Sequence, residues 1–249
     1  MLRTLLTEFK RAVLGWRFAV TIAASTVVAL IGGWSNIMTL RNYGMPEGFG
    51  ELSISAAVAC MQTNLYLLVL PIFCVIPFAD SFVEDFQSRF LRQYLPLAGR
   101  NRYLISKATV TAISGSLALC VSQLIVLLIC TIVLPIQGIE LTEYSVSYKM
   151  FALALLLVLI GSLPWSLAGG IAGAALKNRY MSYAMPFILF YVLSSFQTRY
   201  FRDFYIFSPQ EWIRPMHLEL SLAYISAAVA AAIAFFIYYL VIRRRLYEI

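Results

Sequence analysis

The chain has 249 residues, of which 61% are apolar and 12% charged, and its 19 basic and 12 acidic residues leave a net charge of +7. Soluble domains carry about a quarter charged residues, so this composition excludes an ordinary soluble domain and indicates a chain whose solvent is lipid. Because about 20 residues cross the ~30 Å hydrocarbon layer, the length allows roughly six or seven crossings and no large water-soluble domain.

The first 17 residues predict an amphipathic helix that lies in the membrane interface, because apolar residues recur at helical spacing with basic residues around them. The apolar set is Leu2, Leu5, Leu6, Phe9, Val13 and Trp16, and the basic set is Arg3, Lys10, Arg11 and Arg17. Two roles are open, a membrane anchor with a topology signal or an elbow that braces the helix bundle. Since no small-x-small cleavage site closely follows the first apolar run, we expect the mature chain to keep its N-terminus.

Six apolar runs predict an all-α polytopic membrane protein, because none of them alternates apolar and polar residues as a barrel strand does. Prolines within or at the ends of the runs predict kinks in the second, fourth and fifth helices. In the fourth run, Gly169 and Gly173 allow close approach of another helix, within one subunit or between two. We place the transmembrane helices at residues 18–38, 52–79, 103–135, 150–176, 181–196 and 221–242.

Basic residues predict the orientation of these helices. Fourteen Lys and Arg residues precede the first helix, follow the sixth, or lie in the loops after the second and the fourth. The other side has five, namely Arg41, Lys149, Arg199, Arg202 and Arg214. Because basic loops stay on the cytoplasmic side, we expect both termini in the cytoplasm.

The loop between the second and third helices predicts a short helix over residues 81–94. Ser81 and Glu84 have the spacing of a capping box at its start, and Pro96 and Gly99 follow its end. An apolar stripe lies on one face, formed by Phe82, Val83, Phe86, Phe90 and Tyr94. The stripe could face lipid or a protein groove. Since the polar face mixes acidic and basic residues, which weakens attraction to anionic lipid, we favour a groove in a soluble protein.

The same loop carries a motif. An acidic and an aromatic residue are followed by Ser, then by Pro, a basic residue and a Tyr-Leu-x-x-Lys start to the third helix. The residues are Asp85, Phe86, Ser88, Pro96, Arg102, Tyr103, Leu104 and Lys107. With six crossings and a basic amphipathic N-terminus, the chain resembles the permease subunit of type-2 ABC transporters, of the bacterial exporter kind that includes antimicrobial-peptide export and immunity. It differs at Arg89, where a Gly is common.

The resemblance implies that residues 81–94 are a coupling helix that docks into an ATP-binding subunit. The docking residues would be Ser81, Phe82, Glu84, Asp85, Phe86, Arg89, Phe90 and Tyr94. The chain has no Gly-x-x-x-x-Gly-Lys-[Ser/Thr] phosphate loop, so ATP and Mg are expected in that separate ATPase and no cofactor in this chain. Two permeases and two ATPases would assemble in the bacterial plasma membrane. No nucleic-acid partner is expected.

A transport path is expected between two permease chains. The six apolar runs are centred on residues 18–31, 55–78, 108–134, 150–176, 183–195 and 221–242. None of these ranges contains a charged residue, which disfavours coupling to an ion. Amides at depth, and the place against the second subunit that the resemblance gives the fifth helix, suggest that Gln62, Asn64, Phe187 and Tyr191 border the path. The external residues 197–220 form either an aromatic anchoring belt or, by resemblance, a re-entrant or interfacial cap. The expected substrate is amphipathic or hydrophobic, and peptide by family analogy.

Catalysis by this chain is disfavoured. His217 is the one His and belongs to no His-Glu-x-x-His motif, and the four cysteines lie in apolar runs without metal-binding spacing. The alternative to a permease is a non-transporting membrane scaffold, receptor or channel subunit.

Overall fold

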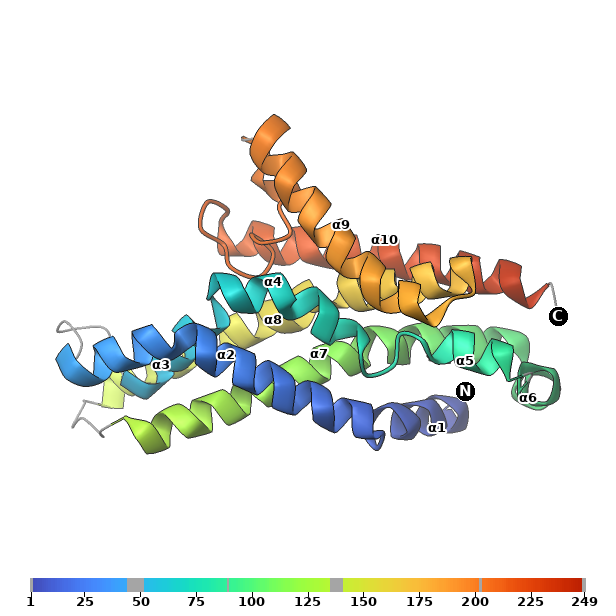
Figure 1. The fold of residues 1–249 in the computed structure, drawn as a ribbon, viewed down its shortest axis with the longest axis horizontal. Coiled ribbons are helices and arrows are strands. Elements are labelled where there is room, and N and C mark those ends of the chain that lie inside the picture. The colour runs from blue at the N-terminus through green and yellow to red at the C-terminus, as the bar shows by residue number, and fades with distance from the viewer. Residues whose placement is uncertain (1, 44–51, 89, 135–140, 202, 248–249) are drawn as a thin grey trace.

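The computed structural model describes residues 2–43, 52–88, 90–134, 141–201 and 203–247, which form an all-helical membrane protein (Figure 1). No β-strand occurs in these ranges. The elements are α1 (Leu2–Val13), α2 (Trp16–Tyr43), α3 (Leu52–Met61), α4 (Asn64–Val75), α5 (Ser81–Gln87), α6 (Phe90–Ala98), α7 (Arg100–Val133), α8 (Leu141–Leu176), α9 (Arg179–Tyr200), the 3-10 helix η1 (Tyr205–Phe207) and α10 (Leu220–Leu246).

Four of the described helices, α2, α7, α8 and α10, are long and apolar enough to cross a membrane. Together α3 and α4 meet the same criterion, but they are bent by 64° at a short break. The described residues thus offer four spans, or five if the bent pair is one span. The helix α9 is not among them, because Tyr, Ser and Gln residues dilute its apolar residues. The six crossings predicted from the sequence are therefore not confirmed.

The break between α3 and α4 interrupts the continuous helix predicted over 52–79. Thr63 has extended backbone angles and caps α4, because its hydroxyl accepts a hydrogen bond from the backbone N–H of Tyr66 at 3.4 Å. The same hydroxyl donates to the Cys60 carbonyl at 3.1 Å. A kink was predicted at the prolines of this run, Pro71 and Pro77, but Pro71 lies inside α4 and not at the bend. A polar cap therefore marks the bend.

The single helix predicted over 81–94 is two helices, α5 and α6, and its capping box does not form. Asp80 is the N-cap of α5 without a side-chain capping bond, since its carboxylate accepts from Arg17 Nη1 at 2.8 and 3.0 Å. Pro96 lies within α6 and does not end it. Gly99, with φ of 80°, separates α6 from α7, and this left-handed angle favours glycine.

The helix α8 lies at the centre of the packing, with contacts to α10, α7, α9 and α4. A Cβ atom on Gly169 would lie 2.6 Å from the Ser182 carbonyl oxygen of α9, and one on Gly173 would overlap the Ser182 side chain. The two glycines therefore let α9 approach α8 closely within one chain, which is the first of the two roles considered for this pair.

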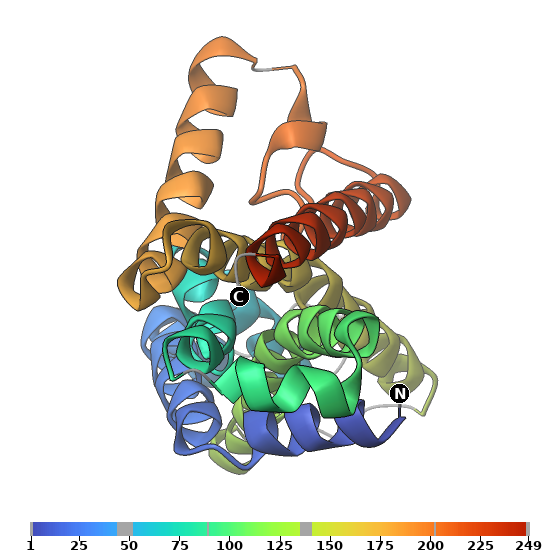
Figure 2. The same ribbon diagram turned by 90° about the vertical axis from the view of Figure 1, so that its right-hand side faces the viewer.

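Both termini lie at one end of the molecule, together with α1, α5 and α6 (Figures 1 and 2). At this end α1 packs on α7, where Ala12 is buried with Phe78 and Val110. This contact fits the bracing role considered for the N-terminal helix, and the role itself stays a prediction. From the same end α9 leans away from the bundle, and the segment after it returns to the start of α10.

Candidate functional site

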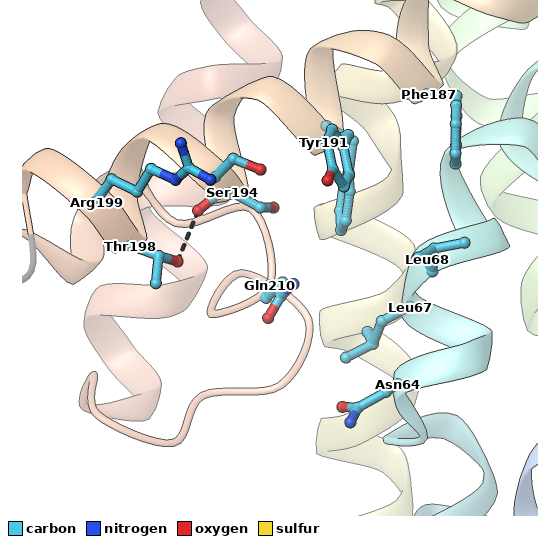
Figure 3. A pocket seen from close by; sticks show the side chains of 11 residues that line it. Asn64, Leu67, Leu68, Phe187, Tyr191, Ser194, Thr198, Arg199 and Gln210 are labelled. Carbon is cyan, nitrogen blue, oxygen red and sulfur yellow. Dashed lines mark hydrogen bonds between the residues drawn. The ribbon is translucent and has the colours of Figure 1, made fainter.

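A cavity of about 430 Å³ lies between α4, α9 and the segment that follows α9 (Figure 3). Its α4 wall consists of Asn64, Leu67 and Leu68, while Gln210 comes from the later segment. Along α9 its lining follows one helix face, with Phe187, Phe190, Tyr191, Ser194, Ser195, Thr198 and Arg199. Counted from Phe187, they recur at i+3, i+4, i+7, i+8, i+11 and i+12, the spacing that puts side chains on the same side of a helix.

The cavity brings together three of the four residues expected at a transport path. Asn64 lies on the α4 wall, and Phe187 and Tyr191 come from α9 (Figure 3). Gln62 is not part of the lining, but it lies at the α3–α4 break directly beside it. That a substrate passes between these residues stays a prediction.

Arg214 fastens the segment after α9 to the break between α3 and α4. Its Nη1 donates to the Gln62 carbonyl at 2.9 Å and to Asn64 Oδ1 at 3.0 Å. The break frees carbonyl groups that a continuous helix would pair, and the guanidinium satisfies one of them. From the sequence, Arg214 was counted only as an external basic residue. The two amide residues Gln62 and Asn64 in an apolar run were the signal that could have indicated a polar partner for Arg214.

The side chains of Glu211 and Trp212 stabilise the conformation of the segment after α9. Glu211 Oε2 accepts from the backbone N–H groups of Met216 at 2.8 Å, His217 at 3.0 Å and Leu218 at 3.3 Å, and Oε1 lies 2.8 Å from His217 Nδ1. Burial opposes ionisation of Glu211, but these hydrogen bonds outweigh it and lower its pKa below 4.5. Trp212 stacks on Trp165 of α8 with centroids 6.1 Å apart.

At the other end of the molecule, α5 is held by a buried ionic network around Asp85. Its Oδ1 accepts from Arg11 of α1 at 2.6 Å, and its Oδ2 accepts from Lys107 of α7 at 2.6 Å and from the Tyr103 hydroxyl at 3.0 Å. Burial would raise the pKa of Asp85, but the two cations outweigh this effect and hold it below 3.8. Asp85 is thus an ionised anchor.

Lys107 is fully buried and bridges two carboxylates. Its ammonium donates to Glu8 of α1 at 3.1 Å as well as to Asp85, and the Glu8 side chain is 4% exposed. The carboxylates of Asp85 and Glu8 balance the charges of Lys107 and Arg11. Charged groups can be buried when they are paired in this way. Sequence reasoning assigned Lys107 to the loop and the family motif, and it did not identify Glu8.

Further polar contacts join α5 to α2, to α9 and to the α8–α9 turn. Arg17 of α2 pairs with Asp80 at the start of α5. Arg179 at the start of α9 lies 3.9 Å from Glu84, and the Gln87 amide donates to the Lys177 carbonyl at 3.2 Å. Four other helices and the α8–α9 turn therefore meet at this short helix.

The residues expected to dock an ATPase differ in how far they are buried within the chain. Ser81, Phe82 and Asp85 are buried within the chain, Phe86 and Tyr94 are partly buried, and Arg89 lies outside the described residues. Glu84 is 37% exposed at its side chain and Phe90 is 42% exposed. Most of the apolar stripe thus packs against α7, α8 and α10 and is not presented to a groove.

Among the described residues, no group of three or more His, Cys, Asp or Glu side chains is placed to hold a metal ion. No protein-family model and no curated protein matches the chain.

Proposed function

We propose that the chain is the transmembrane permease subunit of an ATP-driven exporter, and that α5 passes the movement of a separate ATPase to the cavity. The observation that carries this proposal is the continuity of α4 and α5. Residues 76–80 join the two helices with hydrogen bonds from Ala79 N to Val75 O and from Ser81 N to Phe78 O, each 3.1 Å. Phe78, Ala79 and Asp80 are buried, so the connection leaves little freedom between cavity wall and anchor.

The ATPase would dock on the part of α5 and α6 that remains exposed. Gln87, Ser88 and Phe90 lie there, and the Phe90 ring stacks on Tyr94 with centroids 5.0 Å apart. The buried residues Phe82 and Asp85 would then transmit force instead of making the contact. ATP and Mg would bind to the ATPase, and both termini would lie in the cytoplasm of a bacterial cell.

The cavity supports an amphipathic substrate, because apolar and polar side chains line its two ends. A second permease chain would complete the path, as the resemblance to type-2 ABC permeases implies. A peptide is the substrate that this resemblance favours.

The test uses the full chain reconstituted in vesicles with its phosphate-loop ATPase. We expect Tyr191→Trp to block ATP-dependent export while ATP hydrolysis persists, because the larger ring narrows the cavity and leaves α5 unchanged. Tyr180→Trp is the matched control, since Tyr180 is exposed and does not line the cavity. Export that survives Tyr191→Trp unchanged would contradict the path, and a chain that supports no ATP-dependent export would be a scaffold, receptor or channel subunit.

A further inference from the structure

The cavity lining changes from apolar to polar along α9. Phe187, Phe190 and Tyr191 come first, and Ser194, Ser195, Thr198 and Arg199 follow toward the end of the helix. Arg199 is twelve positions after Phe187, which at a rise of 1.5 Å per residue makes a wall about 18 Å long. Its length and gradient suit an elongated molecule with one apolar and one polar end.

The opposite walls have the same polarity. Asn64 begins α4 and lies toward the polar end with Gln210, while Leu67 and Leu68 follow it along the helix (Figure 3). Because α4 and α9 contribute polar side chains at the same end, the ligand's orientation is set by both walls.

The polar end carries positive charge, and no carboxylate of the described residues pairs with it. Arg199 lines the cavity, and within the described ranges it has no acidic side chain at ion-pair distance. Arg214 adds a second guanidinium through its bond to Asn64. The described residues that line the cavity include no Asp or Glu, and the nearby carboxylate of Glu211 is bonded to His217 and three backbone N–H groups.

We propose that this cavity binds an anionic amphiphile, whose charged head group lies at Arg199 and whose apolar chain lies along Phe187 and Tyr191. The inference rests on the proposed function, because it names the substrate class of the same path. Guanidinium groups bind carboxylate, phosphate and sulfate through paired N–H donors, so any of these head groups fits. The molecule can come from water as a single-chain amphiphile or from the bilayer as an anionic phospholipid.

The experiment is photo-crosslinking to the full chain in phosphatidylcholine nanodiscs. The probe is dodecyl sulfate with a diazirine on its chain, and mass spectrometry locates the labelled peptide. Three competitors share the dodecyl chain and differ in the head group, namely sulfate, uncharged maltoside and trimethylammonium. We expect labelling at Phe187–Tyr191 that only the sulfate displaces at low concentration.

Arg199→Gln should weaken the sulfate's competition by about tenfold, since one partly exposed charged contact is lost. Arg199→Lys should retain most of it. Arg244→Gln, which removes an exposed charge at the other end of the chain, should change nothing. Arg199 is exposed, so its variants should fold, and an unfolding temperature equal to that of the parent chain verifies this.

Phosphatidylglycerol in the nanodisc distinguishes the two sources of ligand. Loss of labelling in the parent chain but not in Arg199→Gln identifies a bilayer lipid as the occupant, and unchanged labelling identifies a water-soluble amphiphile. Equal competition by the three head groups, or no effect of Arg199→Gln, overturns the proposal. The crosslinking experiment contains no ATPase, so it tests the cavity independently of export. If the cavity selects anionic head groups but the chain reconstituted with its ATPase shows no export, the proposed function alone is refuted.

Discussion

The two ends of the molecule differ in whether their charged side chains are buried and paired. Around α5, Lys107, Asp85 and Glu8 are buried and paired, and the aromatic side chain of Phe82 is packed inside the chain. Along α9, apolar side chains such as Tyr191 and Phe196 are exposed, and Arg199 has no acidic partner among the described residues. Buried pairs hold helices in one arrangement, whereas unpaired charge and exposed apolar area are features of surfaces that bind something.

The largest effect should follow from breaking the buried network. Lys107→Met leaves Glu8 and Asp85 without their shared cation, and loss of one partner of a buried pair costs about 3–5 kcal/mol. The measurement is thermal or denaturant unfolding of the purified chain in detergent.

The matched control is Lys149→Met, because Lys149 is exposed and belongs to none of these contacts. Its unfolding free energy should change by less than about 0.5 kcal/mol. Equal stability of the two variants would show that the network does not hold α1, α5 and α7 together.

Close packing between the two regions should give the next largest effect. Gly169→Ala places a Cβ atom against the Ser182 carbonyl and Val75, and such overpacking costs about 1–3 kcal/mol. The free energy of unfolding is again the readout. A neutral substitution would mean that α9 moves away from α8 without cost.

Acid should weaken the α5 end through Asp85. Its pKa is lowered in the folded chain, so the unfolded chain binds the proton first and the stabilisation is lost as pH falls below 3.8 toward the folded pKa. The free energy of unfolding, measured between pH 7 and pH 3, should therefore decrease more steeply for the parent chain than for Asp85→Asn. Parallel curves would contradict an ionised Asp85 in the network.

The smallest stability effect should come from the exposed side of the same end. Phe90→Ala removes a ring that is 42% exposed and stacked on Tyr94, which is worth about 0.5–1.5 kcal/mol beyond area burial. The amount of ATPase that co-purifies should nevertheless fall clearly. If Phe90→Ala keeps the full amount while Phe82→Ala loses it in a folded chain, the dock lies elsewhere.

Local patterns predicted the helical membrane class because composition and run length decide it. They did not predict the α3–α4 break, since a kink was expected at the prolines of this run and the structure bends at Thr63, where a hydroxyl replaces helical hydrogen bonds. The capping box failed for a similar reason. Asp80 became the N-cap of α5, and its carboxylate pairs with Arg17, 63 residues away.

The site was predictable in part. Asn64, Phe187 and Tyr191 do lie together at one cavity, because α4 and α9 pack side by side. The ionic network was not predictable, because Lys107 and Glu8 are 99 residues apart and the sequence does not show which carboxylate meets which cation.

The proposed role of α5 is to move α4, which forms one wall of the cavity, when the ATPase moves. A distance measured across the cavity tests this role most directly. Spin labels on Leu68→Cys and Val192→Cys, with native cysteines replaced, report the separation of α4 and α9 in the chain reconstituted with its ATPase. We expect ATP and Mg to shift this distance distribution in the parent chain, and Phe90→Ala to abolish the shift. Identical distributions with and without nucleotide, in a complex that hydrolyses ATP, would contradict it.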